Sequence, residues 1–544
     1  MKQDITSNKH RIIYAIYTIT LMLIDWTRGS QVGSTWAWTV NMLGVVICLF
    51  LITADGVTNF LKKKYIIWTV IMAIVLLGGY YWWTIHPAVI YRGKLLTAIC
   101  NVWMIVACFM RLFEKNVKSI LEKWKHASKL ALGGALLLLF MFLSVNEDFW
   151  PLWFLLLFIL VYSWEIEKKE TKAIIDGAVD GIIISFFMLQ GAAFIFRPFD
   201  DPDYRYPGIY SNTNMNALFY SIILIAFLCR LYQLRKEQKA IWLRILCFMF
   251  GAAMIGFSVL TVCKTAWVAE VLCLLLYVVV ADIRVLKMKA SQVVLRMTLY
   301  GLVVMISVPI AYLPIRYLPP VFHHPIWYEG EYSESKVHSW DPVDSTKYVS
   351  FDEVIGAVSS RLKPVVEKLY SNENYLTCVH AEEISDPNGI HIGKMFFPWG
   401  DEFTQTYSSY LGRVATWYYY LGNAKIMGHS NQEGHHTGMG ASYTWHAQNA
   451  FLQIWYYFGI PAGILFLITS CGTWVLSIRR SWKDDEERKD GAIFVVMYLS
   501  LFLLFGLFEA VWYPGQMILT LAVFGPKLMM KDKDIHEEIS NSSV

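Results

Sequence analysis

Charged residues are scarce in this chain of 544 residues: they make up 17% of it, while hydrophobic residues make up 56%. A soluble domain usually has about 25% charged and about 45–50% apolar residues, so the composition excludes a soluble enzyme. It also excludes a disordered chain, which needs low hydrophobicity and a high net charge. The 9 cysteines lie within apolar runs, apart from Cys263 and Cys378, which excludes a disulfide scaffold. The net charge of +4 gives no indication of a nucleic-acid partner.

Long apolar runs are abundant instead. A bilayer core of about 30 Å is crossed by about 20 apolar residues in a helix. Fourteen runs are candidates, namely 12–27, 36–53, 66–84, 95–112, 129–145, 148–164, 174–196, 214–232, 241–262, 266–281, 295–315, 450–478, 492–512 and 515–530. The sequence therefore predicts an all-α, polytopic integral membrane protein with about 12 to 14 transmembrane helices.

Lys and Arg residues alternate between the connections of these runs. They accumulate near the N-terminus and in every second connection, at 62–64, 115–125, 168–172, 230–239, 284–289, 479–489 and 527–533. Because cytoplasmic loops carry the excess of Lys and Arg, this alternation predicts an even number of spans with both termini in the cytoplasm. No cleavable signal peptide is apparent, and we expect the first span to act as an uncleaved anchor.

One long segment, 318–446, interrupts the runs, and the alternation places it outside the cytoplasm. It holds 15 acidic and 8 basic residues and 9 of the 13 histidines. Apolar residues at helical spacing predict a helix over about 351–369, which Ser350 and Glu353 would start as a capping box. A second helix is expected over 407–426, ending near Gly428. The expected domains are a bundle of about 11 spans over 1–317, an extracytoplasmic domain over 318–446, transmembrane helices over 447–530 and a cytoplasmic tail over 531–544.

Four places that face outward carry polar residues suited to chemistry. They are Arg205 to Asn214, the Cys263-Lys264 pair, Gly412-Arg413 with Trp417, and the stretch from His446 through Gln448 and Asn449 to Gly459. In this order they resemble the pattern of the bacterial O-antigen ligase and O-antigen or capsule polysaccharide polymerase superfamily. The matching elements are Gly208 with Asn212-Thr213-Asn214, Lys264 after Cys263 where the family has Ser-Arg, Gly412-Arg413 with Trp417, and Asn449 with Gly459.

The resemblance implies a membrane glycosyltransferase of the bacterial cytoplasmic membrane that uses polyprenyl-diphosphate-linked glycans at the outer face. It also implies no metal and no cofactor. Two positions depart from the pattern. Gln448 stands where the family usually has its histidine before the asparagine, and Lys264 replaces an arginine, which keeps the charge but loses the bidentate fork.

The chemistry can be assigned to particular residues. A departing diphosphate needs cations, and Arg205, Lys264 and Arg413 are the candidates. The acceptor hydroxyl needs a base near neutral pH, and His446 is the candidate. Gln448 and Asn449 would orient this base or bind sugar hydroxyls, and Trp417, Asn212 and Asn214 are further candidates for glycan binding. No metal site is expected, because the spacing of His429, His435 and His436 matches no usual zinc pattern.

Simpler interpretations stay open for each of these residues. Arg205 could extend to lipid head groups, Lys264 could have a structural role, Arg413 could pair with Asp401 or Glu402, and His446 could be an interfacial residue without chemistry. The expected partners are the lipid-linked glycan, the bilayer and other membrane proteins of polysaccharide assembly. We favour a polymerase. The alternatives are a ligase that uses another acceptor, a lipid-linked glycan transporter or flippase, and an inactive homologue that only binds glycan.

Overall fold

The computed structural model describes 2–29, 117–125, 127–146, 150–163, 168–200, 203–322, 348–370, 420–430, 447–482, 486–512 and 516–530, with isolated positions between these ranges. All regular structure in this part of the chain is helical, as the composition predicted. The helices are α1 (Lys2–Gly29), α6 (Val117–Lys125), α7 (Lys129–Phe142), α8 (Trp150–Tyr162), α9 (Lys168–Phe196), α10 (Thr213–Lys236), α11 (Ile241–Leu260), α12 (Lys264–Tyr277), α13 (Ala290–Phe322), α14 (Phe351–Tyr370), α17 (Ala450–Tyr457), α18 (Ile460–Trp482), α19 (Glu486–Gly506) and α20 (Met517–Phe524). A π-helical segment, Val278–Val285, extends α12, and a 3₁₀ turn, Gly525–Met529, follows α20.

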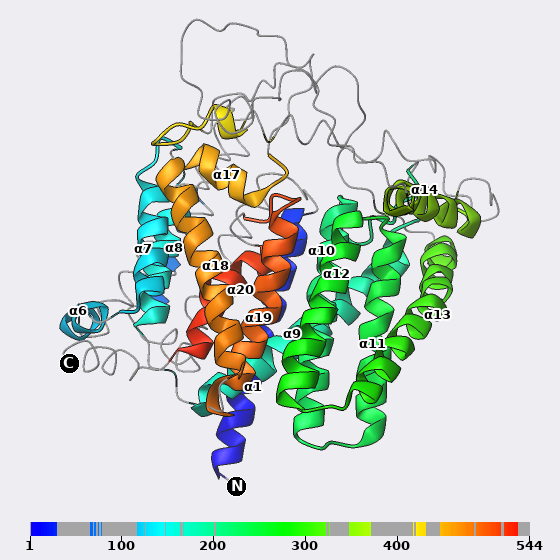
Figure 1. Ribbon diagram of the computed structural model, residues 1–544. Helices are drawn as coiled ribbons and strands as arrows, with labels where there is room; N and C mark the ends of the chain where they lie inside the picture. The colour runs from blue at the N-terminus through cyan, green and yellow to red at the C-terminus, as the bar shows by residue number, and fades with distance from the viewer. Residues whose placement is uncertain are drawn as a thin grey trace, which may run out of the picture.

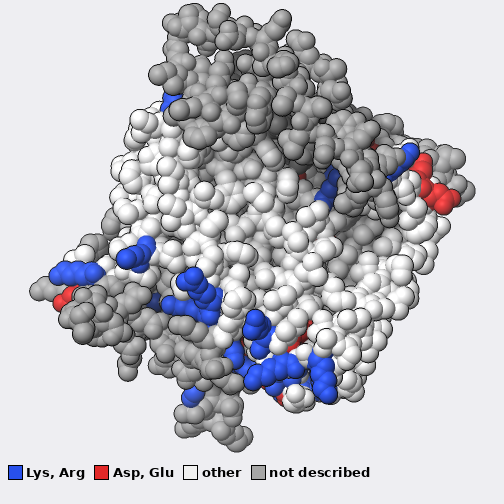
Figure 2. Space-filling model, in the orientation of Figure 1, with Lys and Arg blue, Asp and Glu red and all other residues white. Residues whose placement is uncertain are grey.

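Seven helical segments in the described residues are long and apolar enough to cross a membrane. Most helices run side by side, while α14 and α17 lie across their upper ends, opposite the N-terminus (Figure 1). Figure 2 shows a broad band free of charged side chains, with Lys and Arg gathered near the lower end. An uncharged band of this kind is typical of a protein surface that lies in a bilayer. The expected total of about 12 to 14 spans stays a prediction. The runs 36–53 and 95–112 and most of 66–84 lie outside the described residues.

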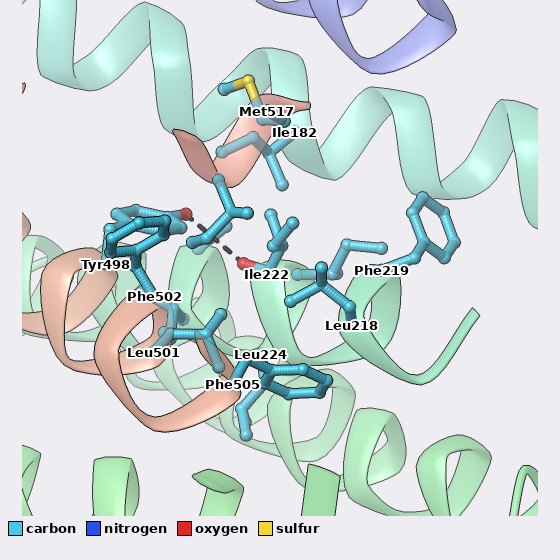
Figure 3. Close-up of a cluster of buried hydrophobic side chains, with 14 of the residues drawn as sticks. Ile182, Leu218, Phe219, Ile222, Leu224, Tyr498, Leu501, Phe502, Phe505 and Met517 are labelled. Atoms are coloured by element: carbon cyan, nitrogen blue, oxygen red, sulfur yellow. Dashed lines mark hydrogen bonds between the residues drawn. The ribbon is translucent and has the colours of Figure 1, made fainter. Parts of the chain in front are cut away.

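Helix α10 lies at the centre of the described bundle. Its membrane-spanning window is 83% buried, the highest share among the seven candidate spans. The Tyr498 hydroxyl of α19 donates a hydrogen bond to the Ile222 carbonyl of α10 at 3.3 Å. Around this contact, side chains of α10 and α19 meet residues of α9 and α20, and the cluster includes Ile182, Leu218, Phe219, Ile222, Leu224, Tyr498, Leu501, Phe502, Phe505 and Met517 (Figure 3). A helix that is apolar around most of its surface is buried on most sides, and α10 therefore packs against several of its neighbours at once.

Several charged side chains within the bundle form ion pairs, which lowers the cost of placing them at membrane depth. Arg230 of α10 pairs with Asp180 of α9, which also accepts from Arg11 of α1 at 2.5 Å. Asp282 in the π-helical segment is fully buried and pairs with Arg235 at 3.1 Å and with Arg296. These pairs join α1 and α9 to α10, and the π-helical extension of α12 to α10 and α13.

The expected span 450–478 is wrong as a single helix, because the chain breaks between α17 and α18. Gly459 at the break has φ +94°, and Gly428 of the preceding turn has φ +79°. The Ile460 amide donates to the Lys425 carbonyl at 3.3 Å and the His429 amide to the Tyr457 carbonyl at 3.1 Å. A side chain at either glycine would collide with the backbone of the other segment, which is why both positions need glycine. The break turns α17 away from the direction of α18 (Figure 1).

The helix expected over 351–369 is confirmed as α14, and so is its capping box. The Ser350 amide donates to the Glu353 carboxylate at 2.8 Å, and the Glu353 amide donates to the Ser350 hydroxyl at 3.3 Å. Most of the second expected helix, 407–426, lies outside the described residues, although positions 420–422 close a helical turn before Gly428. Helix α13 continues to Phe322, so the first residues of the 318–446 segment belong to that helix.

Candidate functional site

The loop from α9 to α10 is fixed by a buried arginine. Arg197 is 2% exposed, and its guanidinium donates to the carbonyls of Gly208 at 2.6 Å, Ile326 at 2.6 Å and Tyr210 at 3.1 Å. Gly208 has φ +59°, and a side chain there would collide with the Asn216 amide, so the glycine of the motif is required by its backbone. Arg197 therefore sets the path of the loop that carries Arg205.

Arg205 is held inside a hydrogen-bonded network. Its Nη2 donates to Asn214 Oδ1 at 2.6 Å, and its Nε donates to the Thr261 carbonyl at 3.1 Å. Asn214 in turn donates from Nδ2 to Glu509 Oε1 at 2.8 Å. Asn212 accepts from the Asn214 amide at 2.8 Å and so caps α10. The two asparagines of the motif thus have different tasks, since one starts the helix and the other joins a cation to a carboxylate.

Asn449 and Trp417 reach the same region from the other side of the bundle. Asn449 caps α17 by accepting from the Leu452 amide at 3.0 Å, and its Nδ2 donates to the Leu507 carbonyl at 2.9 Å. Trp417 Nε1 donates to the Ala447 carbonyl at 2.9 Å, and its ring centre lies 6.2 Å from that of Phe508. Gln448 between them has φ +48°, a conformation that non-glycine residues rarely adopt and that is enriched at functional sites.

The turn after α19 joins these parts. The sequence predicted a span over 492–512, but helix α19 ends at Gly506. Each of the next three residues contacts a different residue from the predicted site. Leu507 accepts from Asn449, Phe508 packs against Trp417, and Glu509 accepts from Asn214. The described part of the structure therefore brings together Arg205, Asn214, Trp417 and Asn449, which are far apart in the sequence. We refer to residues 507–509 as the α19 turn.

Glu509 is the functional candidate that the sequence reasoning missed. It is 6% exposed and is the only charged residue between 492 and 512. An ionisable residue near membrane depth is a functional candidate by default, so the signal was present. Cys263 lies close by. Burial raises the pKa of its thiol to about 11, with Glu509 adding to the increase and Arg205 opposing it. With its pKa raised in this way, the Cys263 thiol stays in its neutral form at neutral pH.

Lys264 stands apart from this network. It begins α12 directly after Cys263, but its side chain is exposed and forms no hydrogen bond to another described residue. Arg413 and His446, the other candidate cation and the candidate base, lie outside the described residues. Within the described residues, no group of three or more His, Cys, Asp and Glu side chains could hold a metal ion.

No known family model matches this chain, and no curated protein is significantly similar to it.

We expect Asn449→Ala to lower the free energy of unfolding by about 1–2 kcal/mol, because the helix cap of α17 and the bond to Leu507 are both lost. Asn449→Asp keeps the acceptor for the cap and should recover about half of this loss. Thermal unfolding of the purified protein in detergent measures both variants. Equal unfolding temperatures for the wild type and Asn449→Ala would show that this residue does not secure the α19 turn.

Proposed function

We propose that this protein is a membrane glycosyltransferase that polymerises polyprenyl-diphosphate-linked oligosaccharides at the outer face of the bacterial cytoplasmic membrane. The observation that best supports the proposal is the Arg205–Asn214–Glu509 network. It joins a cation, an amide and a carboxylate from distant parts of the chain at the outer ends of the helices. Such a partly buried polar network, with a cation fixed in place, suits the recognition of a charged glycolipid.

The proposed reaction assigns a role to each candidate. The oxygen of an acceptor sugar hydroxyl attacks the anomeric carbon of the lipid-linked glycan, and its proton passes to the imidazole of His446. The bond from that carbon to the diphosphate oxygen breaks. Arg413, Lys264 and Arg205 stabilise the negative charge that develops on the departing polyprenyl diphosphate. By the family resemblance, the configuration inverts and no metal takes part.

The supporting residues hold the reacting groups and the sugar in position. Glu509 and Asn214 fix the guanidinium of Arg205, so the cation is oriented before substrate binds. Gln448 and Asn449 lie at the start of α17, next to position 446 in the sequence. We assign them to orienting the base or binding sugar hydroxyls, and Trp417 to stacking on a sugar ring. Asn212 supports the site by capping α10.

The intermediate that accumulates in a deletion strain distinguishes the alternative functions. Loss of a polymerase leaves single repeat units on the lipid carrier, loss of a ligase leaves finished polymer on the carrier, and loss of a flippase traps units on the cytoplasmic leaflet. A polymerase predicts the first result. Accumulation of finished polymer would favour the ligase, whose acceptor differs but whose site would be the same. An inactive glycan-binding homologue, which Gln448 keeps open, would give none of these intermediates.

Arg413→Ala and His446→Ala should each abolish polymer while the protein stays in the membrane, because one loses charge stabilisation and the other the base. The measurement is a polysaccharide gel of the complemented deletion strain, with membrane levels checked by immunoblot. His435→Ala is the matched control and should leave polymer intact. Normal polymer in His446→Ala together with none in His435→Ala would show that the base has been assigned to the wrong histidine.

A further inference from the structure

One carboxyl group lies inside the described bundle without a cationic partner. Glu270 is the only charged residue between 265 and 281, and it is 1% exposed. It lies on the buried face of α12, where Ala266 and Cys273 are 1% exposed or less, while the next residue, Val271, is 54% exposed. Within the described residues, no Lys, Arg or His forms an ion pair with Glu270. Its carboxyl group therefore faces the protein interior.

Helices α10, α11 and α12 run side by side, and two serines lie where they meet (Figure 1). The Ser221 oxygen of α10 lies 2.7 Å from Glu270 Oε1 and 3.0 Å from the Ala217 carbonyl oxygen. Ser258 is close to the end of α11, and Trp267 Nε1 donates to its carbonyl at 3.3 Å. Trp267 and Glu270 are about one turn apart on α12, so Ser258 lies beside the same stretch of that helix.

The two contacts of Ser221 favour a Glu270 that carries a proton. A serine hydroxyl has one hydrogen, and a carbonyl oxygen and an ionised carboxylate are both acceptors only. With an ionised Glu270, Ser221 could donate fully to only one of its two neighbours. With a protonated Glu270, the carboxyl group donates to the Ser221 oxygen, and Ser221 donates to the Ala217 carbonyl. The 2.7 Å separation is usual for a hydrogen bond between two oxygens.

The second carboxyl oxygen supports the same state. Glu270 Oε2 is buried and has no hydrogen-bond partner within the described residues, and neither has the Ser258 hydroxyl. An ionised carboxylate that is removed from water needs a counter-charge or several hydrogen bonds, and this junction offers two hydroxyl groups and no cation. A neutral carboxylic acid has no charge to balance. The polar groups around Glu270 therefore suit the protonated form.

The other titratable groups on the surrounding helices are neutral, exposed or distant. Those closest along the chain are Cys263 and Cys273 on the face of α12 that carries Glu270, Tyr220 of α10, Tyr498 of α19, the exposed Lys264, and Glu509 in the α19 turn. The next charged residues are Arg230, Arg244, Asp282 and Asp490, which lie at least eight residues along their helices from the junction, or about 12 Å. In the described residues, no positive charge therefore stands beside this carboxyl group.

The junction lies two helical turns from the Arg205–Asn214–Glu509 network. Ser221 follows Asn214 by seven residues, about 10 Å along α10, and Glu270 is the seventh residue of α12. At the other level, Arg205 donates to Asn214 at the start of α10 and to the Thr261 carbonyl in the turn before α12. The α11–α12 hairpin is thus joined to α10 at two levels, once through Arg205 and once through Glu270.

We propose that Glu270 is a proton-binding site, whose neutral carboxyl group closes the junction between α10 and α12 through Ser221 at neutral pH. At higher pH the proton passes to water and leaves a buried negative charge without a partner, so the junction opens until water reaches the carboxylate. Because Arg205 joins α10 to the same hairpin, this opening loosens the orientation of its guanidinium. The proton site does not depend on the proposed function, and only its effect on polymer formation does.

Unfolding at different pH values tests the proton site. Between about pH 6 and about pH 7, a glutamate in the unfolded chain is ionised. A native state that holds one more proton loses stability as the pH rises, and its unfolding equilibrium constant increases about tenfold per pH unit. In mixed detergent micelles, the full-length wild type should therefore show this additional increase relative to Glu270→Gln. Glu237→Gln is the matched control, because Glu237 forms an exposed pair with Lys172, and it should keep the wild-type slope.

Infrared spectroscopy of the same proteins detects the protonated group. The spectrum of the wild type minus that of Glu270→Gln at neutral pH should contain the carbonyl stretching band of a carboxylic acid. Ser221→Ala should shift this band, because it removes the hydrogen-bond partner. Glu270→Gln should fold with the wild-type yield, since the amide has the shape of the neutral acid and also donates to Ser221.

Three results would overturn the proton site. They are carboxylate bands in place of the acid band, equal pH slopes of the wild type and Glu270→Gln, and a Glu270→Gln protein that does not fold although Glu270→Asp folds. The link to Arg205 has its own readout, since polymer formation should decline at lower pH in the wild type than in Glu270→Gln. If the deletion strain disproves the proposed function, the unfolding and infrared results still decide the proton site.

Discussion

Glu509→Ala should reduce polymer formation by a factor on the order of 10², because it removes the carboxylate that Asn214 contacts and with it the orientation of Arg205. Glu509 is 6% exposed, and its Oε1 accepts from Asn214 at 2.8 Å. Glu509→Gln keeps an acceptor at this place but loses the charge that balances the guanidinium. We therefore expect Glu509→Gln to fall between the wild type and the alanine variant. Polymer yield in the complemented deletion strain measures the effect.

A double-mutant cycle separates the positioning role from a loss of stability. If Glu509 and Asn214 act on Arg205 through one network, the effect of Asn214→Ala and Glu509→Ala together should be much smaller than the product of the single effects. Glu237→Gln is the matched control, since Glu237 pairs with Lys172 at 2.7 Å at the C-terminal end of α10, whereas Asn214 lies at the start of that helix. If the Glu509→Ala variant forms as much polymer as the wild type, the Arg205–Asn214–Glu509 network has no role in the proposed mechanism.

The helices of the described bundle could be predicted from the sequence because apolar length and Lys/Arg alternation respond to the bilayer itself. The break at Gly459 was missed for the same reason. Residues on both sides of it are apolar, so hydropathy does not distinguish one long helix from α17 followed by α18. The physical cause is a backbone contact between Gly459 and the turn at Gly428. Contacts between distant segments leave only a weak trace in the sequence, here the Gly459-Ile460-Pro461 stretch.

The candidate site was predictable in part. Arg205 and Asn214 belong to one short motif, and the structure confirms that they are in contact. Asn449 could be recognised as a polar residue before an apolar helix, but its partner at Leu507 is a backbone carbonyl, which no side-chain pattern reveals. Grouping Lys264 with Arg205 stays a prediction. The guanidinium of Arg205 is bonded to Asn214 and Thr261, and no hydrogen bond between described residues joins the two cations.

Arg197→Gln should cause the largest loss of stability, about 3–5 kcal/mol, because Arg197 is buried and satisfies three carbonyls from two separate segments. A glutamine amide has fewer donors and a shorter reach, so the Gly208, Tyr210 and Ile326 carbonyls cannot all stay paired. An unpaired buried carbonyl costs about 1–3 kcal/mol. Arg197→Lys should be nearly as harmful, since an ammonium lacks the planar fork that these carbonyls require.

The measurement is thermal unfolding of each variant in detergent, together with the yield of folded protein in the membrane. Lys172→Gln is the matched control. It also removes a cation, but the Lys172 and Glu237 side chains are 59% and 39% exposed, and such a surface pair contributes less than about 1 kcal/mol. An Arg197→Gln protein that unfolds at the wild-type temperature would show that the loop does not depend on this residue.

If instead Arg197→Gln folds at low temperature and its polymer yield also falls, the loop that carries Arg205 has lost its position while the membrane-spanning helices remain folded. The Arg205–Asn214–Glu509 network then depends on the loop that Arg197 holds through the Gly208, Tyr210 and Ile326 carbonyls.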